Sequence, residues 1–190
     1  MTENNSTLRT TLILAGLDEI NNYGVSNFSM RRIATACNVS CAAPYRHFKD
    51  KNEFIASIID YTNEIWAARQ EEIISRCSDS LREQIIEIIL GYIRFLMDNP
   101  SYRSVLIMKN DDFDNLYHKK RTQFGSLSQT LEHQLFEASG FAPDVWKRKV
   151  LVCRSLIFGT VFLMDAGEFE YNDTTMEHIR FTINREFEAP

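Results

Sequence analysis

Hydrophobic positions recur with a helical period along almost the whole chain. In the first helix the apolar face runs from Leu8 to Ile20, and the helix is expected to end at Gly24, since glycine readily adopts the left-handed backbone that ends helices. A second helix of only two turns follows Ser29, a good N-cap. Asn38 follows that helix, at a position where the chain must turn and where Asn tolerates the left-handed conformation.

Later helices begin at recognisable capping residues. Ser40 is expected to cap a third short helix with Pro44 in its first turn. Further helices are predicted from the capping-box pairs Asp50/Glu53 and Ser80/Glu83, from Asn99-Pro100, over about 114–138, over about 143–166, and from Asp173 or Thr174 onward. No stretch alternates as a strand does. The predicted fold class is all-α, with about nine helices, in which a three-helix helix-turn-helix head precedes a helical body.

Composition narrows the class of protein. The 190 residues are 44% hydrophobic and 25% charged, with a net charge of -5, so the whole chain has no basic signature. Residues 1–51 nevertheless carry a net charge of +2 and the remainder -7. The start lacks a signal peptide, and the longest apolar run is far shorter than the roughly 20 residues that span a bilayer. The four cysteines form no CxxC pair and no Cys/His ligand spacing, so no metal site is expected. Together these features predict a reduced, cytoplasmic protein, for which no cofactor and no membrane partner are expected.

The most informative stretch is CNVSCAAPYRHFKDK, residues 37–51. Two short helices joined by a tight turn make a helix-turn-helix, whose second helix reads the major groove of DNA. Cys41, Ala42 and Ala43 are small enough for close approach and suit thymine methyl groups. Arg46 can either fork onto a guanine or pair with a phosphate.

The longer run GVSNFSMRRIATACNVSCAAPYRHFKDKNEF resembles the N-terminal domain of TetR-family transcriptional regulators. The matching positions are Gly24, Ser29-Met30, Ile33-Ala34, Val39-Ser40, Tyr45, His47-Phe48 and Lys51. The resemblance covers residues 6–66, and it implies a DNA-binding domain there and a ligand-binding and dimerisation domain over residues 67–190. It also implies that Tyr45 and His47 hold phosphates. The expected DNA-binding residues are Ser29, Arg31, Ser40, Cys41, Ala42, Ala43, Tyr45, Arg46, His47 and Lys51.

The resemblance implies a small-molecule pocket in the body, for which an apolar or aromatic effector is expected. The candidate lining residues are Trp66, Tyr92, Phe95, Tyr102, Met108, Tyr117, Phe124, Phe158 and Phe162, although such residues at helical spacing are more often core. A homodimer is expected because a palindromic operator needs two heads. The candidate dimer residues in the last two helices are Leu156, Gly159, Thr160, Leu163, Ile179, Ile183 and Phe187.

Other interpretations are weaker. Cys37 and Cys41 could form a metal or redox pair, but they belong to different predicted helices. His47 or His118 could serve a small all-α enzyme, yet no nucleophile, paired base or phosphate loop accompanies either residue. The acidic run 110–114 lacks the glycine and distal glutamate of a calcium loop. A helical adaptor that keeps the head as a relic would lack salt-sensitive DNA binding. The favoured interpretation is a ligand-responsive transcriptional regulator. A repressor is favoured over an activator, and an enzyme is not expected.

Overall fold

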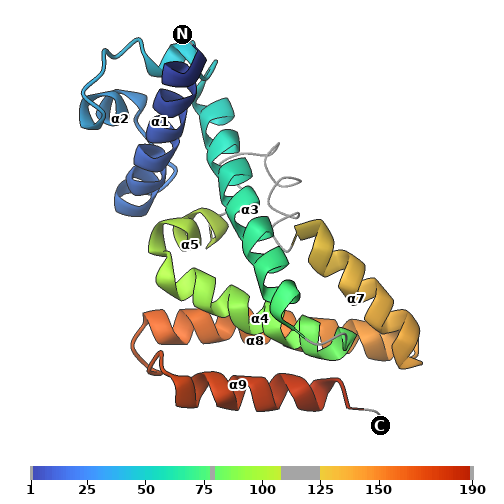
Figure 1. Cartoon of the computed structure of the whole chain (residues 1–190). Helices are drawn as coiled ribbons and strands as arrows, with labels where there is room; N and C mark the ends of the chain where they lie inside the picture. Colours follow the sequence, from blue (N-terminus) through green and yellow to red (C-terminus); the bar gives the residue numbers. More distant parts are fainter. Residues whose placement is uncertain (1, 78–79, 108–124, 189–190) are drawn as a thin grey trace. The chain divides into compact units, whose positions relative to one another are not determined.

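The computed structural model describes residues 2–77, 80–107 and 125–188, and every regular element in these ranges is helical (Figure 1). The elements are α1 (Thr2–Tyr23), α2 (Met30–Ala36), the 3-10 helix η1 (Pro44–Arg46), α3 (Lys51–Arg76), α4 (Leu81–Asp98), α5 (Pro100–Ile107), α7 (Gly125–Ser139), α8 (Pro143–Asp165) and α9 (Asp173–Glu186). The all-α prediction is confirmed. The start of the helix expected over 114–138 lies outside the described residues.

Contacts divide the described chain into two compact units. The N-terminal unit comprises residues 2–65 and 99–107, and the C-terminal unit comprises 66–77, 80–98 and 125–188. The unit boundary after Ile65 lies close to the expected domain boundary, but α5 belongs with the N-terminal unit, where it packs on α1. The functional division into 6–66 and 67–190 stays a prediction.

Three phenylalanines form the centre of the N-terminal unit. Phe48 stacks on Phe54 with ring centroids 3.9 Å apart, and Phe28 meets Phe54 edge-on at 5.3 Å. All three are buried among apolar side chains of α1, α2 and α3. Gly16 allows this packing, because a Cβ at that position would lie 2.6 Å from the terminal carbon of Ile58. The sequence therefore brings α1 and α3 into close contact through a glycine.

The turn after α2 forms as expected. Asn38 has a φ of 55°, in the left-handed region. The Val39 N–H donates to the Ala34 carbonyl at 3.0 Å, and the Asn38 N–H donates to the Thr35 carbonyl at 3.1 Å. These two bonds make a Schellman motif, which satisfies the carbonyls at the end of α2. Gly24 follows α1 and also adopts the left-handed region, with a φ of 72°, and its N–H donates to the Ile20 carbonyl at 2.9 Å.

The third predicted helix is not an α-helix. Residues 41–43 form a turn, and only Pro44–Arg46 is helical, as a 3-10 helix. The Ala43 N–H donates to the Ser40 carbonyl at 2.9 Å. Pro44 has no N–H to offer that carbonyl, so the i-to-i-4 ladder cannot start at Ser40 and the segment tightens to i-to-i-3 bonds. The N-cap of η1 is Ala43, without a side-chain bond, so Ser40 does not have the expected capping role.

Helix α4 is the centre of the C-terminal unit and packs against α7, α8 and α9. Its buried face includes Ile86, Leu90 and Ile93. Arg180 ties α9 to α4 through ion pairs with Glu83, at 2.9 Å, and Glu87. The N-cap of α9 is Asn172, whose side chain accepts the Thr175 N–H at 2.9 Å, one residue before the expected cap. None of the described helices is both long and apolar enough to span a bilayer.

Candidate DNA interface and ligand pocket

The segment between α2 and α3 presents most of the expected base-contacting residues to solvent. Cys41, Ala42 and Arg46 are exposed, and Tyr45 is 60% exposed although it is aromatic. Ala43 is buried at 8% because the inner side of the tight turn packs on the head. Of the three small residues, only Cys41 and Ala42 are therefore accessible for close contact with a base, and Ala43 is not. Ser40 is exposed and His47 is half-buried.

Lys51 lies at the start of α3 and is anchored there. Its Nζ donates to the Ser26 carbonyl at 3.3 Å and lies 6.0 Å from the centre of the Phe28 ring. The Asp50 carboxylate accepts the Glu53 N–H at 2.9 Å, which confirms the predicted cap. The amine of Lys51 is thus held beside the first turn of α3, where helix N–H groups also favour an anion.

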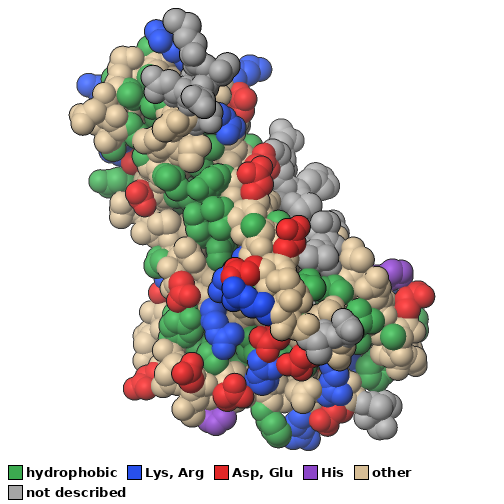
Figure 2. Space-filling view, viewed as in Figure 1, with side chains coloured by type: hydrophobic (Ala, Val, Ile, Leu, Met, Phe, Trp, Pro, Cys, Tyr) green, Lys and Arg blue, Asp and Glu red, His purple; other side chains and the backbone are tan. Residues whose placement is uncertain are grey.

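Helix α2 presents Arg31 to solvent while Ser29 caps its start. The Ser29 hydroxyl accepts the Arg32 N–H at 3.4 Å. Arg32 itself forms an ion pair with Glu19 of α1, and the hydrogen bond to Glu19 is the main reason why the pKa of Arg32 is raised. Sequence reasoning missed this pair, although Glu19 occupies the apolar face of the first helix between Leu17 and Ile20. On the face drawn in Figure 2, Lys and Arg side chains lie around the tip of the N-terminal unit, and side chains of both signs occur on each of the two units.

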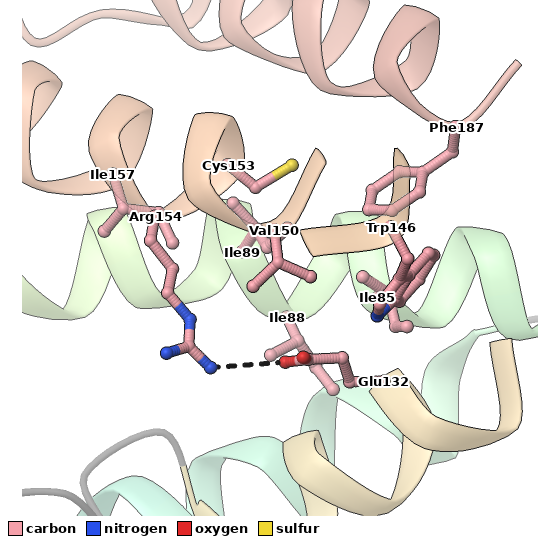
Figure 3. A pocket seen from close by; sticks show the side chains of 10 residues that line it. All are labelled: Ile85, Ile88, Ile89, Glu132, Trp146, Val150, Cys153, Arg154, Ile157 and Phe187. Atoms are coloured by element: carbon pink, nitrogen blue, oxygen red, sulfur yellow. Dashed lines mark hydrogen bonds and ion pairs between the residues drawn. The ribbon is translucent and has the colours of Figure 1, made fainter. Parts of the chain in front are cut away.

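The C-terminal unit contains a small cavity of about 40 Å³ (Figure 3). Its walls come from α4, α7 and α8 and from the residue after α9, and they consist of Ile85, Ile88, Ile89, Glu132, Trp146, Val150, Cys153, Arg154, Ile157 and Phe187. Eight of these ten side chains are apolar. The other two, Glu132 and Arg154, pair with each other at 3.4 Å. Burial raises the pKa of the Cys153 thiol to about 12, so the thiol is protonated at neutral pH and belongs to the apolar part of the wall.

None of the expected pocket residues that the structure describes lines this cavity. Trp66 packs against Tyr92 at 4.8 Å and against Phe95 at 5.3 Å, so these three form an aromatic cluster in the core. Phe158 and Phe162 are exposed, and Tyr102 belongs to the N-terminal unit. Met108, Tyr117 and Phe124, like the acidic run 110–114 and His118, lie outside the described residues.

The metal or redox pair considered above depends on how the cysteines and possible metal ligands lie in the part of the chain that the structure describes. Within those ranges no three His, Cys, Asp or Glu side chains gather as they would around a metal ion. Cys37 is half-buried with its Sγ 3.9 Å from the Thr11 carbonyl, Cys41 is exposed, and both thiols are free. Cys37 is therefore a half-buried residue of the N-terminal unit, and Cys41 is a surface residue.

Comparison with known proteins decides the identity of the head. Residues 12–58 match the family model described as bacterial regulatory proteins, tetR family. This match covers α2, the turn and the exposed segment up to η1, together with the adjoining parts of α1 and α3. The chain has a TetR-family DNA-binding domain. The resemblance inferred from the sequence is confirmed. The chain is a DNA-binding transcriptional regulator.

Solved structures share the fold of the whole chain. A TetR family transcription regulator from Marinobacter aquaeolei VT8 has 18% identity and a TM-score of 0.66, with 98% of each chain covered. A Clostridium perfringens protein named as a candidate fatty acid metabolism regulator has 16% identity and a TM-score of 0.75, covering 95% of this chain and 100% of that one. A single-residue variant of TetR from Acinetobacter baumannii AYE in complex with minocycline has 17% identity and a TM-score of 0.57, covering 93% and 92%. No curated protein matches in sequence.

The C-terminal unit presents an apolar stripe on α8. Leu151, Phe158 and Phe162 follow one another at helical spacing and are 65%, 46% and 66% exposed. Gly159 on the same helix is exposed, and Leu156, Thr160 and Leu163 are half-buried. The other expected dimer residues face inward: Ile179 and Ile183 are buried in their own protomer, and Phe187 lines the cavity. The dimer stays a prediction. The α8 stripe is the exposed apolar surface through which two copies could pair.

Proposed function

We propose that the protein is a homodimeric TetR-type repressor that leaves a palindromic operator when a small apolar or aromatic effector binds its body. The observation that carries this proposal is the segment Cys41–Arg46, which follows the Schellman turn of α2 in a domain that matches the tetR family. Four of its side chains are exposed, those of Cys41, Ala42, Tyr45 and Arg46. TetR-family regulators are generally non-enzymatic DNA-binding proteins. The α8 stripe supports pairing of two copies, so that two heads read the two halves of one operator.

Lys51 supplies the first test of the head. Replacing Lys51 with Ala should weaken binding to specific and random DNA alike, because phosphate contacts position a protein without specifying a sequence. The slope of log affinity against log salt should flatten by roughly 1 per lost contact, so by about 2 in a symmetric dimer. Lys49→Ala, at an exposed neighbour outside the expected contact set, is the matched control. An unchanged slope in the Lys51 variant would remove this lysine from the phosphate set.

Arg46 lies at the end of η1, after the small residues that approach the groove, and we assign it to a phosphate. Arg46→Ala should then weaken all sequences together and leave the DNA motif selected from random fragments intact. If Arg46 instead forks onto a guanine, the variant should lose about 1–3 kcal/mol per half-site and relax one symmetric pair of motif positions. Motifs selected by the wild type and by the variant separate these outcomes.

The cavity indicates the class of effector. Its walls are apolar, and its two charged groups are already paired with each other. An uncharged ligand leaves the Glu132–Arg154 pair intact, whereas a carboxylate or an amine would have to displace one partner. A volume of about 40 Å³ exceeds the roughly 10–15 Å³ that one water needs, so only a few heavy atoms fit without rearrangement. The effector is therefore small, uncharged and mostly apolar. A structure of the same fold in complex with minocycline supports ligand binding by such a body.

Filling the cavity tests this assignment. Val150→Phe should keep operator binding and abolish its release by small uncharged compounds, because the added ring occupies the ligand's space. Val152→Phe places the same change at an exposed position of α8 outside the cavity, and it should respond as the wild type does. Operator release is measured by fluorescence anisotropy across a library that includes carboxylate and amine homologues of each compound. Full response in the Val150 variant would place the effector elsewhere.

A further inference from the structure

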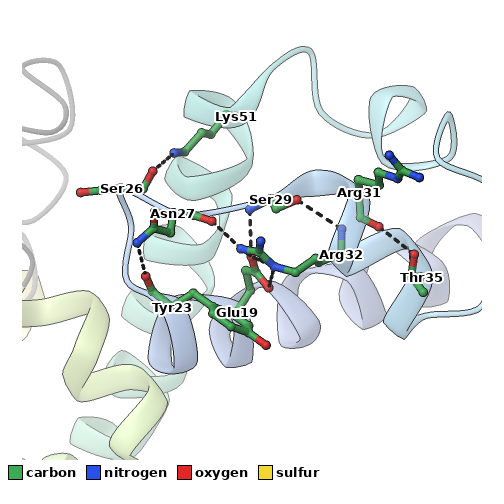
Figure 4. A network of polar contacts seen from close by, with 9 residues as sticks. All are labelled: Glu19, Tyr23, Ser26, Asn27, Ser29, Arg31, Arg32, Thr35 and Lys51. Carbon is green, nitrogen blue, oxygen red and sulfur yellow. Dashed lines mark hydrogen bonds and ion pairs between the residues drawn. The ribbon is translucent and has the colours of Figure 1, made fainter.

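Glu19 is a buried carboxylate in the middle of the DNA-binding head. It lies on α1, and its side chain is 5% exposed. One of its oxygens, Oε1, accepts the Ser29 N–H at 2.9 Å and the Arg32 Nε–H at 2.9 Å (Figure 4). A further hydrogen bond joins the same oxygen to Arg32 Nη2. Burying a charge is unfavourable unless it is fully paired, so these bonds account for its presence.

The side chain of Arg32 is held by several contacts within the head. Its Nη2 also donates to the Asn27 carbonyl, and its guanidinium lies 4.4 Å above the Tyr23 ring. A residue held by a carboxylate, a carbonyl and an aromatic face cannot extend to a phosphate without breaking these contacts. Arg31, its neighbour in α2, is exposed. The two arginines are both exposed but differ in their contacts: the guanidinium of Arg32 is held by Glu19, Asn27 and Tyr23 although 46% of its side chain is accessible, whereas Arg31 lies on the outer side of α2.

The contacts of Glu19 and Arg32 close a ring around the start of α2. Glu19 holds the Ser29 N–H, the Ser29 hydroxyl caps the Arg32 N–H, and the Arg32 side chain returns to Glu19. The bond from Arg32 to Asn27 fixes the loop that leads into this cap. Since α2 has only seven residues, fixing its first turn sets the rotation of the whole helix and so the direction of Arg31.

We propose that Glu19 and Arg32 are positioning residues for DNA binding, which lock the rotation of α2 so that Ser29 and Arg31 face the phosphate backbone. This inference rests on the proposed function of the head. It assigns a favourable role in DNA binding to an acidic side chain. A purely structural role is the alternative, in which loss of the pair lowers the stability of the head but does not weaken DNA binding by the molecules that remain folded.

The sign of one charge change separates these roles. Glu19→Gln removes a negative charge from the head, and by electrostatics alone this should strengthen binding to DNA. If Glu19 positions α2, the same change should weaken binding to the selected operator, by about tenfold, the loss expected for one charge-assisted hydrogen bond. Asp18→Asn is the matched control, because Asp18 is an exposed neighbour on α1 outside the ring. Its affinity should be unchanged or higher.

Affinity is measured well below the unfolding temperature, on full-length protein whose helical content matches the wild type. Equal or tighter binding by folded Glu19→Gln overturns the inference. Should that variant not fold, Arg32→Lys serves instead, since it keeps the charge on a half-exposed side chain but cannot fork between Glu19 and Asn27. It should also bind about tenfold more weakly, and wild-type affinity would overturn the inference. Wild-type protein that binds no DNA fragment refutes the proposed function instead.

Discussion

Phe162→Glu is expected to convert the proposed dimer into a folded monomer that binds the operator roughly a hundredfold or more weakly, since one head loses the effective concentration that the second provides. Phe162 is 66% exposed, so a glutamate there is solvated in the isolated protomer and costs it little. In a dimer formed through the α8 stripe the same charge would be buried without a partner, next to its symmetry mate. The variant should therefore keep its helical content and lose only the association.

Sedimentation velocity and operator titration on the same sample check this expectation. Leu14→Glu, which changes an exposed apolar residue of α1, should remain dimeric and is the control for oligomeric state. A wild-type protein that is monomeric at micromolar concentration would contradict the dimer. A dimeric Phe162→Glu would move the interface away from the α8 stripe.

A charge at Ile183 should have a different effect. The spacing of Ile179, Ile183 and Phe187 suggested a stripe for a second copy, but Ile183 is fully buried within its own protomer. Helical periodicity identifies the face that is covered and not what covers it. In α9 the cover is the protomer's own α4 and α8. Ile183→Glu would therefore unfold the C-terminal unit and would not yield a folded monomer.

Local chemistry made the helix boundaries predictable. Gly24 and Asn38 adopt the left-handed backbone that their side chains tolerate, and Asp50 caps α3 as its spacing with Glu53 indicated. The same reasoning failed at Pro44, because the loss of one first-turn hydrogen bond was expected to be tolerable in an α-helix that starts at Ser40, whereas the segment tightens to a 3-10 helix instead. Sequence reasoning thus succeeds where one or two neighbouring residues determine the outcome.

The site residues that were missed depend on distant parts of the chain. Glu19 and Arg32 are 13 positions apart, and only the packing of α2 on α1 brings them together. The cavity is a space that α4, α7 and α8 leave unfilled, and its isoleucines are spaced like any core residues. Trp66 and Tyr92 were candidates for lining because they are large, yet large side chains also fill space most completely.

Phe48→Ala is expected to unfold the head and abolish DNA binding while the C-terminal unit stays folded. Phe48 is 1% exposed, its ring stacks on Phe54 at an interplanar angle of 6°, and the Arg9 guanidinium lies 5.3 Å from its centre. Removing a buried phenylalanine costs about 3–5 kcal/mol, because the transferred area is lost and a cavity remains.

Whether the head unfolds depends on how this loss of stability compares with the total stability of the head. A head of roughly 60 residues has about 3–9 kcal/mol of stability at typical values per residue, so the loss is comparable to the whole. Hydrogen exchange should show lost protection in α1 and α2 and retained protection in α4, α8 and α9. Phe48→Leu, which keeps most of the volume, should retain a folded head, and exposed Tyr45→Phe should weaken DNA binding without any loss of protection. Full protection of α1 in Phe48→Ala would show that the stacked pair with Phe54 is not what holds the head together.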